Sequence, residues 1–489
     1  MSKKLIDFYE LTMAQVDLSN GFENQWQCFD LYFRNDRREG VEQKGYSISA
    51  GLSEIIDYIQ NISFSEEELD YLKNNTDLSG KFLKYLRTFK FTGDIYAIPD
   101  GTPIFPGEPI LTVWAPAPQA KIIETDILNR FNHACSIATK AKRIVDAAHG
   151  RSVMEFGARR AQGDTAAING AKYAYIAGCI GTSCYGTGLS YNVPLLGTMA
   201  HSLVTQFPTE YEAFLAYAKE FPDNSVLLVD TYDTLQSGIP NAIRVAKEYL
   251  EPMGKRLKGV RLDSGDLAYL SKEARKMLDR EGLNDCKIIA SNSLDEYTIE
   301  NMLLKGEAMI DSFGVGENLI TSKASPVFGG VYKLVATSNS EDGRVRPKIK
   351  VSDDPAKTTV PGRKRLYRFY DKDSGFALGD LVALADEEIP IDNYKLVDHT
   401  DPSKYKDLSN YVLRELQVPI FEKGKLVYTV PSIEESREYC RKEFETLYPE
   451  IKRFLNPHVY YVDLSVKLAK LKNYMSVKQR EKNGKREAI

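Results

Sequence analysis

The sequence predicts an α/β fold in which parallel strands alternate with helices between about residues 150 and 320. Short apolar runs recur through this segment, and amphipathic stretches such as 268–280 and 294–305 separate them. Alternation of this kind is typical of parallel βα units. The apolar runs are residues 152–157, 193–197, 226–230, 259–263, 287–291 and 308–311. Six units favour a barrel, although an open doubly wound sheet is also compatible, and either fold gathers the strand-end residues at one face.

The chain before this series is predicted to form an N-terminal domain over residues 1–145. Residues 91–98 and 110–114 alternate between apolar and polar residues as strands do, and Gly and Pro residues mark the turns around them. A helix is expected from about residue 120 to 148. This domain therefore combines strands and helices but lacks the regular βα alternation of the central domain, which we place at residues 146–329.

The chain after the series returns to strand-like patterning over residues 330–400, as in the run 331–335. We expect this segment to complete the N-terminal sheet domain. Residues 401–489 are rich in Lys and are predicted to form a helical C-terminal region. Residues 465–489 carry eight basic and two acidic residues. A solvated tail is the favoured interpretation, and a surface for an anionic partner is the alternative.

Length and composition restrict the class of protein. At 489 residues the chain exceeds what one core supports, and 43% hydrophobic with 27% charged residues is ordinary for a soluble globular protein. A net charge of −4 disfavours nucleic acid as a partner. No stretch of about 18 apolar residues predicts a membrane span, and the charged start predicts no signal peptide, so a cytoplasmic location is expected. The six cysteines form no CxxC pair, which disfavours zinc and disulfides.

His201 is the first candidate catalytic residue. It follows the apolar run 193–197 in the order Gly197-Thr198-Met199-Ala200-His201. Imidazole transfers protons near neutral pH and can act as a nucleophile, so a histidine presented at a strand end is suited to catalysis. A core or helix-capping role for His201 remains open on this segment alone.

The strand end at residues 155–163 combines an aromatic side chain with two arginines. Phe156 offers a face for a flat ring, and Arg159 and Arg160 offer planar forks of donors for carboxylate or phosphate. Core packing for Phe156 and a surface ion pair for Arg160 are the alternatives.

Two further strand ends carry acids. Arg261 and Asp263 share one side of their predicted strand, and Asp263 is suited to bind a ribose diol or a Mg²⁺-bound diphosphate. Asp266 is predicted to cap the next helix. Of Asp230 and Asp233, one is expected to hold an imidazole in a fixed tautomer and the other to cap a helix.

Residues 311–318 are predicted to form a glycine-bearing loop with Gly314 and Gly316. Exposed backbone N–H groups at such a position bind anions, most often phosphate, and barrels favour the last strand ends for this purpose. The chain has no GxxxxGK[ST] sequence, so it is not predicted to be a P-loop ATPase. Together the strand ends predict a pocket for a phosphorylated sugar and a small planar anion.

The same pocket allows two other interpretations. An aldolase or isomerase would need a Lys or acid base at a strand end, and no strand-end Lys occurs in the six apolar runs. A non-catalytic ligand-binding relative would be expected to have lost His201 or Arg159, and both are present.

The motifs taken together resemble the nicotinate phosphoribosyltransferase family. The matching runs, in order, are residues 7–14, 155–163, 197–202, 259–267, 289–292 and 311–319. Residues 350–352 and 357–362 also resemble the family. Each run alone is unspecific, but their joint occurrence is highly specific, whereas residues after about 400 contribute little.

This resemblance implies a type II phosphoribosyltransferase fold, which is an irregular α/β barrel with an α/β sandwich domain, followed here by the helical C-terminal region. It implies a homodimer whose active sites lie at the subunit interface. The implied substrates are nicotinate and 5-phosphoribosyl 1-diphosphate, and the products are nicotinate mononucleotide and diphosphate. The reaction would require Mg²⁺ and would be coupled to ATP hydrolysis through a phosphohistidine, as the first step from nicotinate to NAD.

Individual roles follow from the same resemblance. His201 would be the phosphohistidine, Asp233 would orient it, and Asp263 would face the ribose or the leaving group and reach the metal through the diphosphate. The substrate-binding residues so implied are Tyr9, Phe156, Arg159, Thr182, Ser183, Arg261, Ser291, Gly314 and Gly316. Phe156 and Tyr9 of the partner subunit would sandwich the pyridine ring, the two arginines would contact nicotinate or phosphoribosyl diphosphate, and the two glycines would cradle the 5′-phosphate.

Ser183 bears on the choice of pyridine. Nicotinamide-specific relatives resemble Gly-Thr-Asp where this chain has Gly181-Thr182-Ser183. An acid there would accept from an amide and repel a carboxylate, whereas Ser183 can donate to a carboxylate, so nicotinate is favoured. The family's glycine loop often continues with Thr, but Glu317 follows Gly316 here, which leaves the phosphate contacts open.

Overall fold

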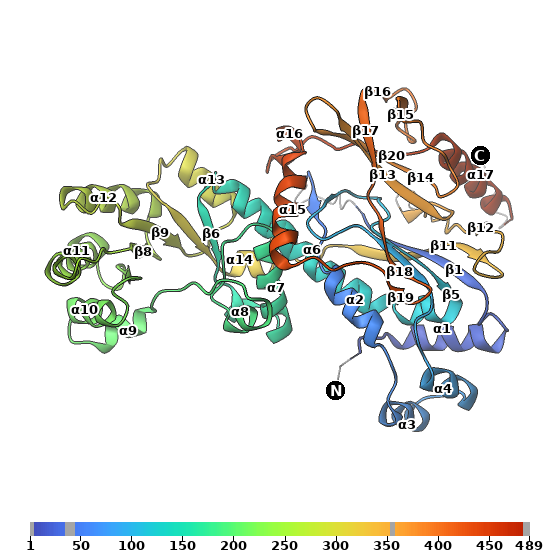
Figure 1. The fold of residues 1–489 in the computed structure, drawn as a ribbon, viewed down its shortest axis with the longest axis horizontal. Coiled ribbons are helices and arrows are strands. Elements are labelled where there is room, and N and C mark those ends of the chain that lie inside the picture. Colours follow the sequence, from blue (N-terminus) through green and yellow to red (C-terminus); the bar gives the residue numbers. More distant parts are fainter. Residues whose placement is uncertain (1–3, 35–44, 353–356, 483–489) are drawn as a thin grey trace. The chain divides into compact units, whose positions relative to one another are not determined.

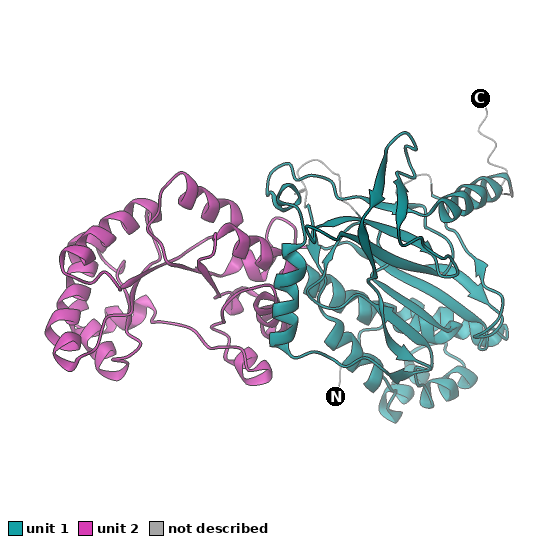
Figure 2. Cartoon of the chain, turned by 45° about the horizontal axis from the view of Figure 1, so that its top comes forward, with its two compact units in different colours: residues 1–135, 327–489 teal, residues 136–326 magenta. Residues whose placement is uncertain are grey.

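The computed structural model describes residues 4–34, 45–352 and 357–482. The chain forms two compact units, shown in Figure 2: unit 1 comprises residues 1–135 and 327–489, and unit 2 comprises residues 136–326. The boundaries lie within about ten residues of those predicted for the N-terminal and central domains. Residues 401–489 belong to unit 1 and do not form a unit of their own.

Unit 2 is built around the predicted series of parallel strands (Figure 1). Its five-stranded sheet has the order β6-β10-β9-β8-β7, and all neighbours are parallel. The strands are β6 (Ser152–Glu155), β7 (Val226–Leu228), β8 (Gly259–Leu262), β9 (Lys287–Ser291) and β10 (Ser312–Val315). Single parallel bridges extend it beyond β6, from Glu155 to Thr182 and from Thr182 to Leu195. Within the described residues no ladder joins Leu195 to β7, so a closed barrel is not found, and the predicted irregular α/β barrel stays a prediction.

Two of the six predicted strands differ from expectation. Residues 193–197 make only the bridge at Leu195, which is 51% exposed. Pro194 has no N–H to donate, which opposes a regular ladder there. Residues 308–311 precede the strand instead of forming it, because β10 begins at Ser312. Gly314 is therefore inside a strand, and the predicted glycine loop is reduced to the turn at Gly316.

Three helices of unit 2, α10 (Glu210–Glu220), α12 (Leu267–Arg280) and α13 (Glu296–Leu304), begin at a side chain that caps them. Asp266 accepts a hydrogen bond from the Tyr269 N–H at 3.0 Å, which confirms its predicted role at the start of α12. The other helices of the unit are α7 (Asp164–Ile176), α8 (Tyr185–Tyr191), α9 (His201–Gln206), α11 (Ile239–Val245) and α14 (Glu317–Ile320). They connect successive strands, so each strand end points to the same edge of the sheet.

Two of the sheets in unit 1 share one hydrophobic core. The first has the order β12-β11-β1-β5-β3-β18-β19, and the second has the order β17-β13-β14-β20. Leu31 and Val113 of the first sheet and Leu366 and Val382 of the second belong to the same buried cluster. The strands named here are β1 (Trp26–Phe33), β3 (Asp94–Ala97), β5 (Leu111–Pro116), β11 (Gly330–Ser338), β12 (Arg346–Pro347), β13 (Lys364–Asp371), β14 (Ala377–Leu384), β17 (Tyr411–Glu415), β18 (Val418–Glu422), β19 (Lys425–Leu426) and β20 (Val462–Leu464). This arrangement is a sandwich.

The segment after unit 2 completes the N-terminal sheet, as predicted, because β11 pairs antiparallel with β1. The later strand β13 belongs to the second sheet instead. One long helix, α6 (Glu124–Ala147), follows the short α5 (Ala117–Ile122) and spans the predicted helical segment. Helix α1 (Phe8–Ser19) precedes β1, and α2 (Leu52–Asn61), α3 (Glu66–Asn75) and α4 (Gly80–Arg87) follow it.

The C-terminal region is not helical throughout, which corrects the prediction for residues 401–489. Strands β16 (Tyr405–Ser409), β17, β18 and β19 occupy its first part, and β16 pairs with β15 (Asn393–Val397). The pairing of β17 with β13, which joins distant parts of the sequence, stabilises this segment as strands. Helices begin at α15 (Ile433–Glu445), followed by α16 (Pro449–Lys452) and α17 (Val466–Lys482). Residues 483–489 of the basic tail lie outside the described residues.

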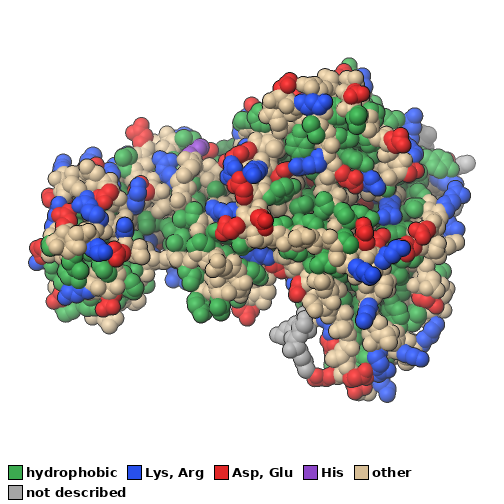
Figure 3. Space-filling model, viewed as in Figure 1, with side chains coloured by type: hydrophobic (Ala, Val, Ile, Leu, Met, Phe, Trp, Pro, Cys, Tyr) green, Lys and Arg blue, Asp and Glu red, His purple; other side chains and the backbone are tan. Residues whose placement is uncertain are grey.

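The surface offers no bias towards one sign of charge on the face shown in Figure 3, where Lys and Arg side chains are interspersed with Asp and Glu. Among the described residues, no helix is both long enough and apolar enough to cross a membrane.

Candidate active site

His201 is the first residue of α9 and is held by a buried carboxylate. Its Nε2 lies 3.2 Å from Asp230 Oδ1, and the Asp230 side chain is only 2% exposed. Ser264 Oγ donates to the other oxygen, Oδ2, at 2.5 Å. A carboxylate fixed in this way holds the proton on Nε2 and leaves Nδ1 with its lone pair. The imidazole is therefore oriented and remains 43% exposed.

The acid beside His201 is Asp230, which corrects the role implied for Asp233. Asp233 accepts hydrogen bonds from the N–H groups of Leu235 at 3.0 Å and Gln236 at 2.7 Å. It caps the helical turn that follows β7. Both roles were anticipated for this pair of acids, but they are exchanged. Asp230 directly follows the strand segment, so its side chain is placed at the strand end where His201 arrives.

Arg261 is a half-buried cation at the end of β8. Its Nη1 donates to Thr198 Oγ1 at 2.6 Å, while its Nε is buried and has no hydrogen-bond partner. Burial lowers the pKa of Arg261, Asp263 and Asp230 oppose that shift, and the charge of Arg159 adds to it. Arg159 itself is exposed. A buried guanidinium with an unused donor, electrostatically coupled to a second one, is suited to bind an anion.

Asp263 lies directly after β8 and is held by the end of β9. Ser291 Oγ donates to Asp263 Oδ1. The backbone after Ser291 is unusual, since Asn292 and Ser293 both have positive φ, of 95° and 48°. Strained backbone of this kind is concentrated at functional sites. The structure thus brings Asp263 and Ser291 together as neighbouring strand ends.

Phe156 packs directly on the backbone of Gly314. A Cβ at Gly314 would lie 2.5 Å from Phe156 Cδ2, so only glycine admits the ring at this place. Gly314 is paired on both sides within the sheet, with Met154 and Ser291. In the structure Gly314 therefore seats Phe156, and its predicted contact with a phosphate stays a prediction. Gly316 remains at the turn between β10 and α14.

Thr182 is fully buried and bonded to an acid. Its Oγ1 donates to Glu155 Oε2 at 2.6 Å, and burial raises the pKa of Glu155. The Cys184 N–H donates to the same hydroxyl at 2.9 Å. Ser183 is exposed, and its N–H donates to the Glu155 carbonyl at 3.0 Å. Thr182 therefore positions the turn, whereas the Ser183 side chain is available to a ligand.

Three residues of the site were not singled out from the sequence: Glu155, Thr198 and Ser264. Glu155 could have been found from the sequence, because it is a charged residue at the end of an apolar run. Thr198 and Ser264 flank predicted residues but carry no pattern of their own. Tyr9, in contrast, lies on α1 in unit 1, where it is 45% exposed and has its pKa raised to about 12 by burial and by Glu124. All other predicted site residues lie in unit 2.

Comparison with known proteins identifies the family of this chain. The N-terminal domain model of nicotinate phosphoribosyltransferases matches residues 5–132, the family model matches residues 151–384, and the C-terminal domain model matches residues 363–472.

Individual relatives agree with these matches along most of the chain. A nicotinate phosphoribosyltransferase of Bacillus subtilis is 44% identical over 465 residues, covering 94% of this chain and 92% of that protein. One of Mycobacterium tuberculosis is 37% identical over 449 residues, covering 91% and 88%. The crystal structure of human nicotinic acid phosphoribosyltransferase is 28% identical, with a TM-score of 0.83, and covers 96% of this chain and 100% of that one. The chain therefore belongs to the nicotinate phosphoribosyltransferase family.

Proposed function

We propose that the protein transfers the phosphoribosyl group of 5-phosphoribosyl 1-diphosphate to nicotinate, giving nicotinate mononucleotide and diphosphate on the way to NAD. The pyridine nitrogen forms the new bond to C1 of the ribose as the bond to diphosphate breaks. The observation that carries this proposal is the half-buried Arg261, whose Nε has no partner, at a strand edge shared with Asp263 and Asp230. Both substrates are anions, and a buried unpaired donor is costly unless an anion completes it.

The ring and the anionic groups have separate partners. Phe156 is fixed on Gly314 and is half-buried, so it offers a surface on which the pyridine can stack. Arg261 and the exposed Arg159 can bind the nicotinate carboxylate or the phosphates. Gly314 and the turn at Gly316 are the candidates for the 5′-phosphate. Ser183 can donate a hydrogen bond to the carboxylate.

Mg²⁺ fits the donors at this edge of the sheet. Asp263 and Asp230 offer carboxylate oxygens, the ligands that Mg²⁺ prefers, and Mg²⁺ is commonly held by one or two carboxylates together with substrate phosphates. The group of three His or acidic side chains close enough to share an ion, Asp398, His399 and Asp463, lies in unit 1 among the described residues. Asp263 would hold the ion through the diphosphate, and the ion would neutralise charge on the leaving group.

A homodimer with shared sites accounts for Tyr9. The side chains of Phe8 and Tyr9 are 50% and 45% exposed on α1. Exposed aromatic side chains are typical of interfaces. We propose that Tyr9 of the partner subunit covers the pyridine ring opposite Phe156.

The choice of pyridine tests the proposed reaction directly. Nicotinate and nicotinamide are nearly isosteric, so discrimination must come from the carboxylate, whose charge-assisted hydrogen bonds are worth about 1.5–3 kcal/mol each. We expect kcat/KM for nicotinate to exceed that for nicotinamide by about a hundredfold, measured as diphosphate release with and without ATP. Ser183→Asp should lower nicotinate use by like-charge repulsion, whereas Ser183→Asn should lower it less. Equal use of both pyridines by the parent would contradict the proposal.

ATP coupling is proposed to proceed through a phosphoryl group on His201 Nδ1. The bond from the γ-phosphorus to the ADP oxygen breaks as the bond to Nδ1 forms, and Asp230 stabilises the proton on Nε2. With γ-labelled ATP, we expect acid-labile label in the parent and none in His201→Ala. Asp230→Asn should lose most of the label, while Asp233→Asn, the matched control at the helical turn, should keep it. Label that persists in His201→Ala, or that depends on Asp233 and not on Asp230, would refute the assignment.

A further inference from the structure

A pocket of about 570 Å³ lies within unit 1, on side chains from both sheets of the sandwich. Its wall is unusually basic. The cations that line it are Arg344, Arg363, Lys364 and Arg365, and the acids are Asp386 and Glu415. The volume lies within the range of about 300–1,000 Å³ usual for small-molecule sites. Every residue that lines it belongs to unit 1, and none of them is a strand-end residue of unit 2.

Two of the four cations are already neutralised. Lys364 Nζ lies 2.7 Å from Asp30 Oδ2, and both side chains are buried. Lys364 also donates to the carbonyls of Val360 and Gly362. Arg365 Nη1 pairs with Glu415 Oε2 at 3.4 Å. These two side chains therefore contribute little net charge to the pocket.

The other two cations, Arg344 and Arg363, have no carboxylate within ion-pair distance among the residues that the structure describes. The remaining acid of the wall, Asp386, is paired with Lys467 at 3.3 Å. The pocket thus carries an excess of two positive charges, both on guanidinium groups. Two unpaired guanidinium groups in one pocket favour a ligand with about two negative charges.

Arg363 is held in place by aromatic rings. Its guanidinium carbon lies 5.3 Å from the ring centroid of Trp114 and 5.7 Å from that of Tyr96. Stacking over a ring fixes the plane of the guanidinium but leaves its N–H edge free to donate. Apolar side chains complete the wall, including Leu384 and Leu471. The pocket therefore combines a positioned anion-binding group with a surface for an organic moiety.

We propose that this pocket binds a small phosphorylated metabolite, with its phosphate between Arg344 and Arg363 and its organic part against Leu384 and Leu471. A phosphate monoester carries about −1.5 to −2 charges at pH 7, which matches the excess of the wall, and its oxygens suit the guanidinium fork. This is a second ligand site, in addition to the proposed substrate site of unit 2.

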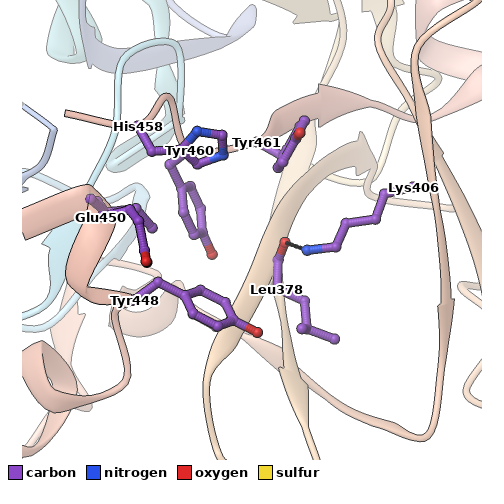
Figure 4. Close-up of a pocket in the computed structure, with 9 residues that line it drawn as sticks. Leu378, Lys406, Tyr448, Glu450, His458, Tyr460 and Tyr461 are labelled. Atoms are coloured by element: carbon purple, nitrogen blue, oxygen red, sulfur yellow. Dashed lines mark hydrogen bonds between the residues drawn. The ribbon is translucent and has the colours of Figure 1, made fainter. Parts of the chain in front are cut away.

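A second pocket in unit 1 has no comparable excess of positive charge in its wall. It measures about 270 Å³, and Figure 4 shows Tyr448, Tyr460 and Tyr461 around it. Its Lys406 donates to the Leu378 carbonyl at 2.9 Å, and Glu450 lines the same wall. The cation and the acid offset each other there, so Lys406→Ala is a matched control that removes one positive charge from unit 1 outside the proposed site.

The two tryptophans provide a local measurement of binding. Trp114 lies beneath Arg363, Trp26 lies 5.7 Å from Trp114 between ring centroids, and the chain contains no other tryptophan. Unit 2 therefore contributes no tryptophan signal. We would titrate the full-length protein with adenosine monophosphate and with inorganic phosphate, at constant ionic strength, and record tryptophan emission. Binding should be saturable, tighter for the nucleotide, and stronger as the pH rises through the phosphate pKa of about 6.

Substitutions separate this site from the substrate site. Arg344 is exposed and has no ion-pair partner among the described residues, so Arg344→Ala should weaken binding of the nucleotide at least tenfold. Arg363→Gln should abolish binding. If Arg363→Gln does not fold, the result for Arg344→Ala decides the test. Arg261→Ala and Lys406→Ala should leave the titration unchanged. Loss of the signal in Arg261→Ala would mean that the substrate site causes it. No saturable change up to millimolar phosphate and nucleotide, or an equal response to malonate, would overturn the proposal.

Discussion

Arg261→Ala should lower kcat/KM for nicotinate and for phosphoribosyl diphosphate by more than a hundredfold. The side chain is half-buried, its Nε has no protein partner, and the acids Asp230 and Asp263 flank it. Its removal would cost a desolvated charge-assisted contact of about 3 kcal/mol or more in the transition state, and would leave the two acids to repel anionic substrates. Steady-state kinetics with each substrate varied in turn would measure the effect.

Two control variants make the Arg261 result specific. Arg256, in the same unit, is partly exposed and pairs with Asp285 and Glu251, so Arg256→Ala should leave kcat/KM within a factor of about two. Arg261→Lys should recover part of the activity, because the charge returns without the fork. If Arg261→Ala and Arg256→Ala behaved alike, Arg261 would not contact substrate.

The Arg261 variant also tests the proposed shared site. Mixed dimers of Arg261→Ala and Tyr9→Ala chains contain one site in which Arg261 of one chain and Tyr9 of the other are both intact. Such hybrids should recover up to half of the parent activity after subunit exchange. If the hybrids were as inactive as the two single-variant homodimers, Tyr9 would either act within its own chain or lie outside the site.

Glu296→Ala should destabilise the protein by about 3–5 kcal/mol, the largest stability effect that we expect for a side chain outside the site. Its carboxylate is fully buried and lies 2.6 Å from Lys140 Nζ and 2.8 Å from Arg143 Nε, whose side chains are 5% and 1% exposed. Loss of the carboxylate leaves two buried cations without their negatively charged partner. Removing one member of a buried ion pair in this way is strongly destabilising. Chemical and thermal denaturation would measure the change.

The effect of Glu296 should depend on pH in a defined direction. Burial opposes ionisation, but Lys140 and Arg143 outweigh it and lower the pKa of Glu296. A lowered pKa means that the stabilisation is present above the carboxyl's ordinary pKa and is lost as the pH falls through the lowered value. The difference in the free energy of unfolding between the parent and Glu296→Ala should therefore become smaller in acid. Glu317→Ala, which breaks an exposed pair with Lys323, should change stability by less than about 1 kcal/mol at any pH.

The sequence was sufficient to predict the βα series and most of the strand ends. Four of six predicted strands of unit 2 occur where apolar runs end in polar residues, because a buried parallel strand must be apolar along its length and its polar neighbour falls at the sheet edge. The same logic placed Arg261 and Asp263 beside one another. The same reasoning placed a strand at 308–311, which is wrong. Apolar residues that precede a strand cannot be told from the strand by composition.

The contacts that define the site were decided by tertiary structure. Asp230 reaches His201 across 29 residues of sequence, and Arg261 reaches Thr198 across 63. Local periodicity carries no information on such pairs, and Asp230 and Asp233 are equivalent in composition, so only the packed sheet distinguishes the partner of the imidazole from the helix cap.

The sequence by itself determined the family and the residue types at the strand ends. The runs around Phe156, His201 and Arg261 occur together in the sequence, and their recognition needs no knowledge of the fold. Only the folded chain decided that Gly314 seats a ring, and that Arg344 and Arg363 line one pocket and have no ion-pair partner among the described residues. The physical reason is that side-chain type is a property of the sequence, whereas burial and unmatched charge depend on which distant segments pack together.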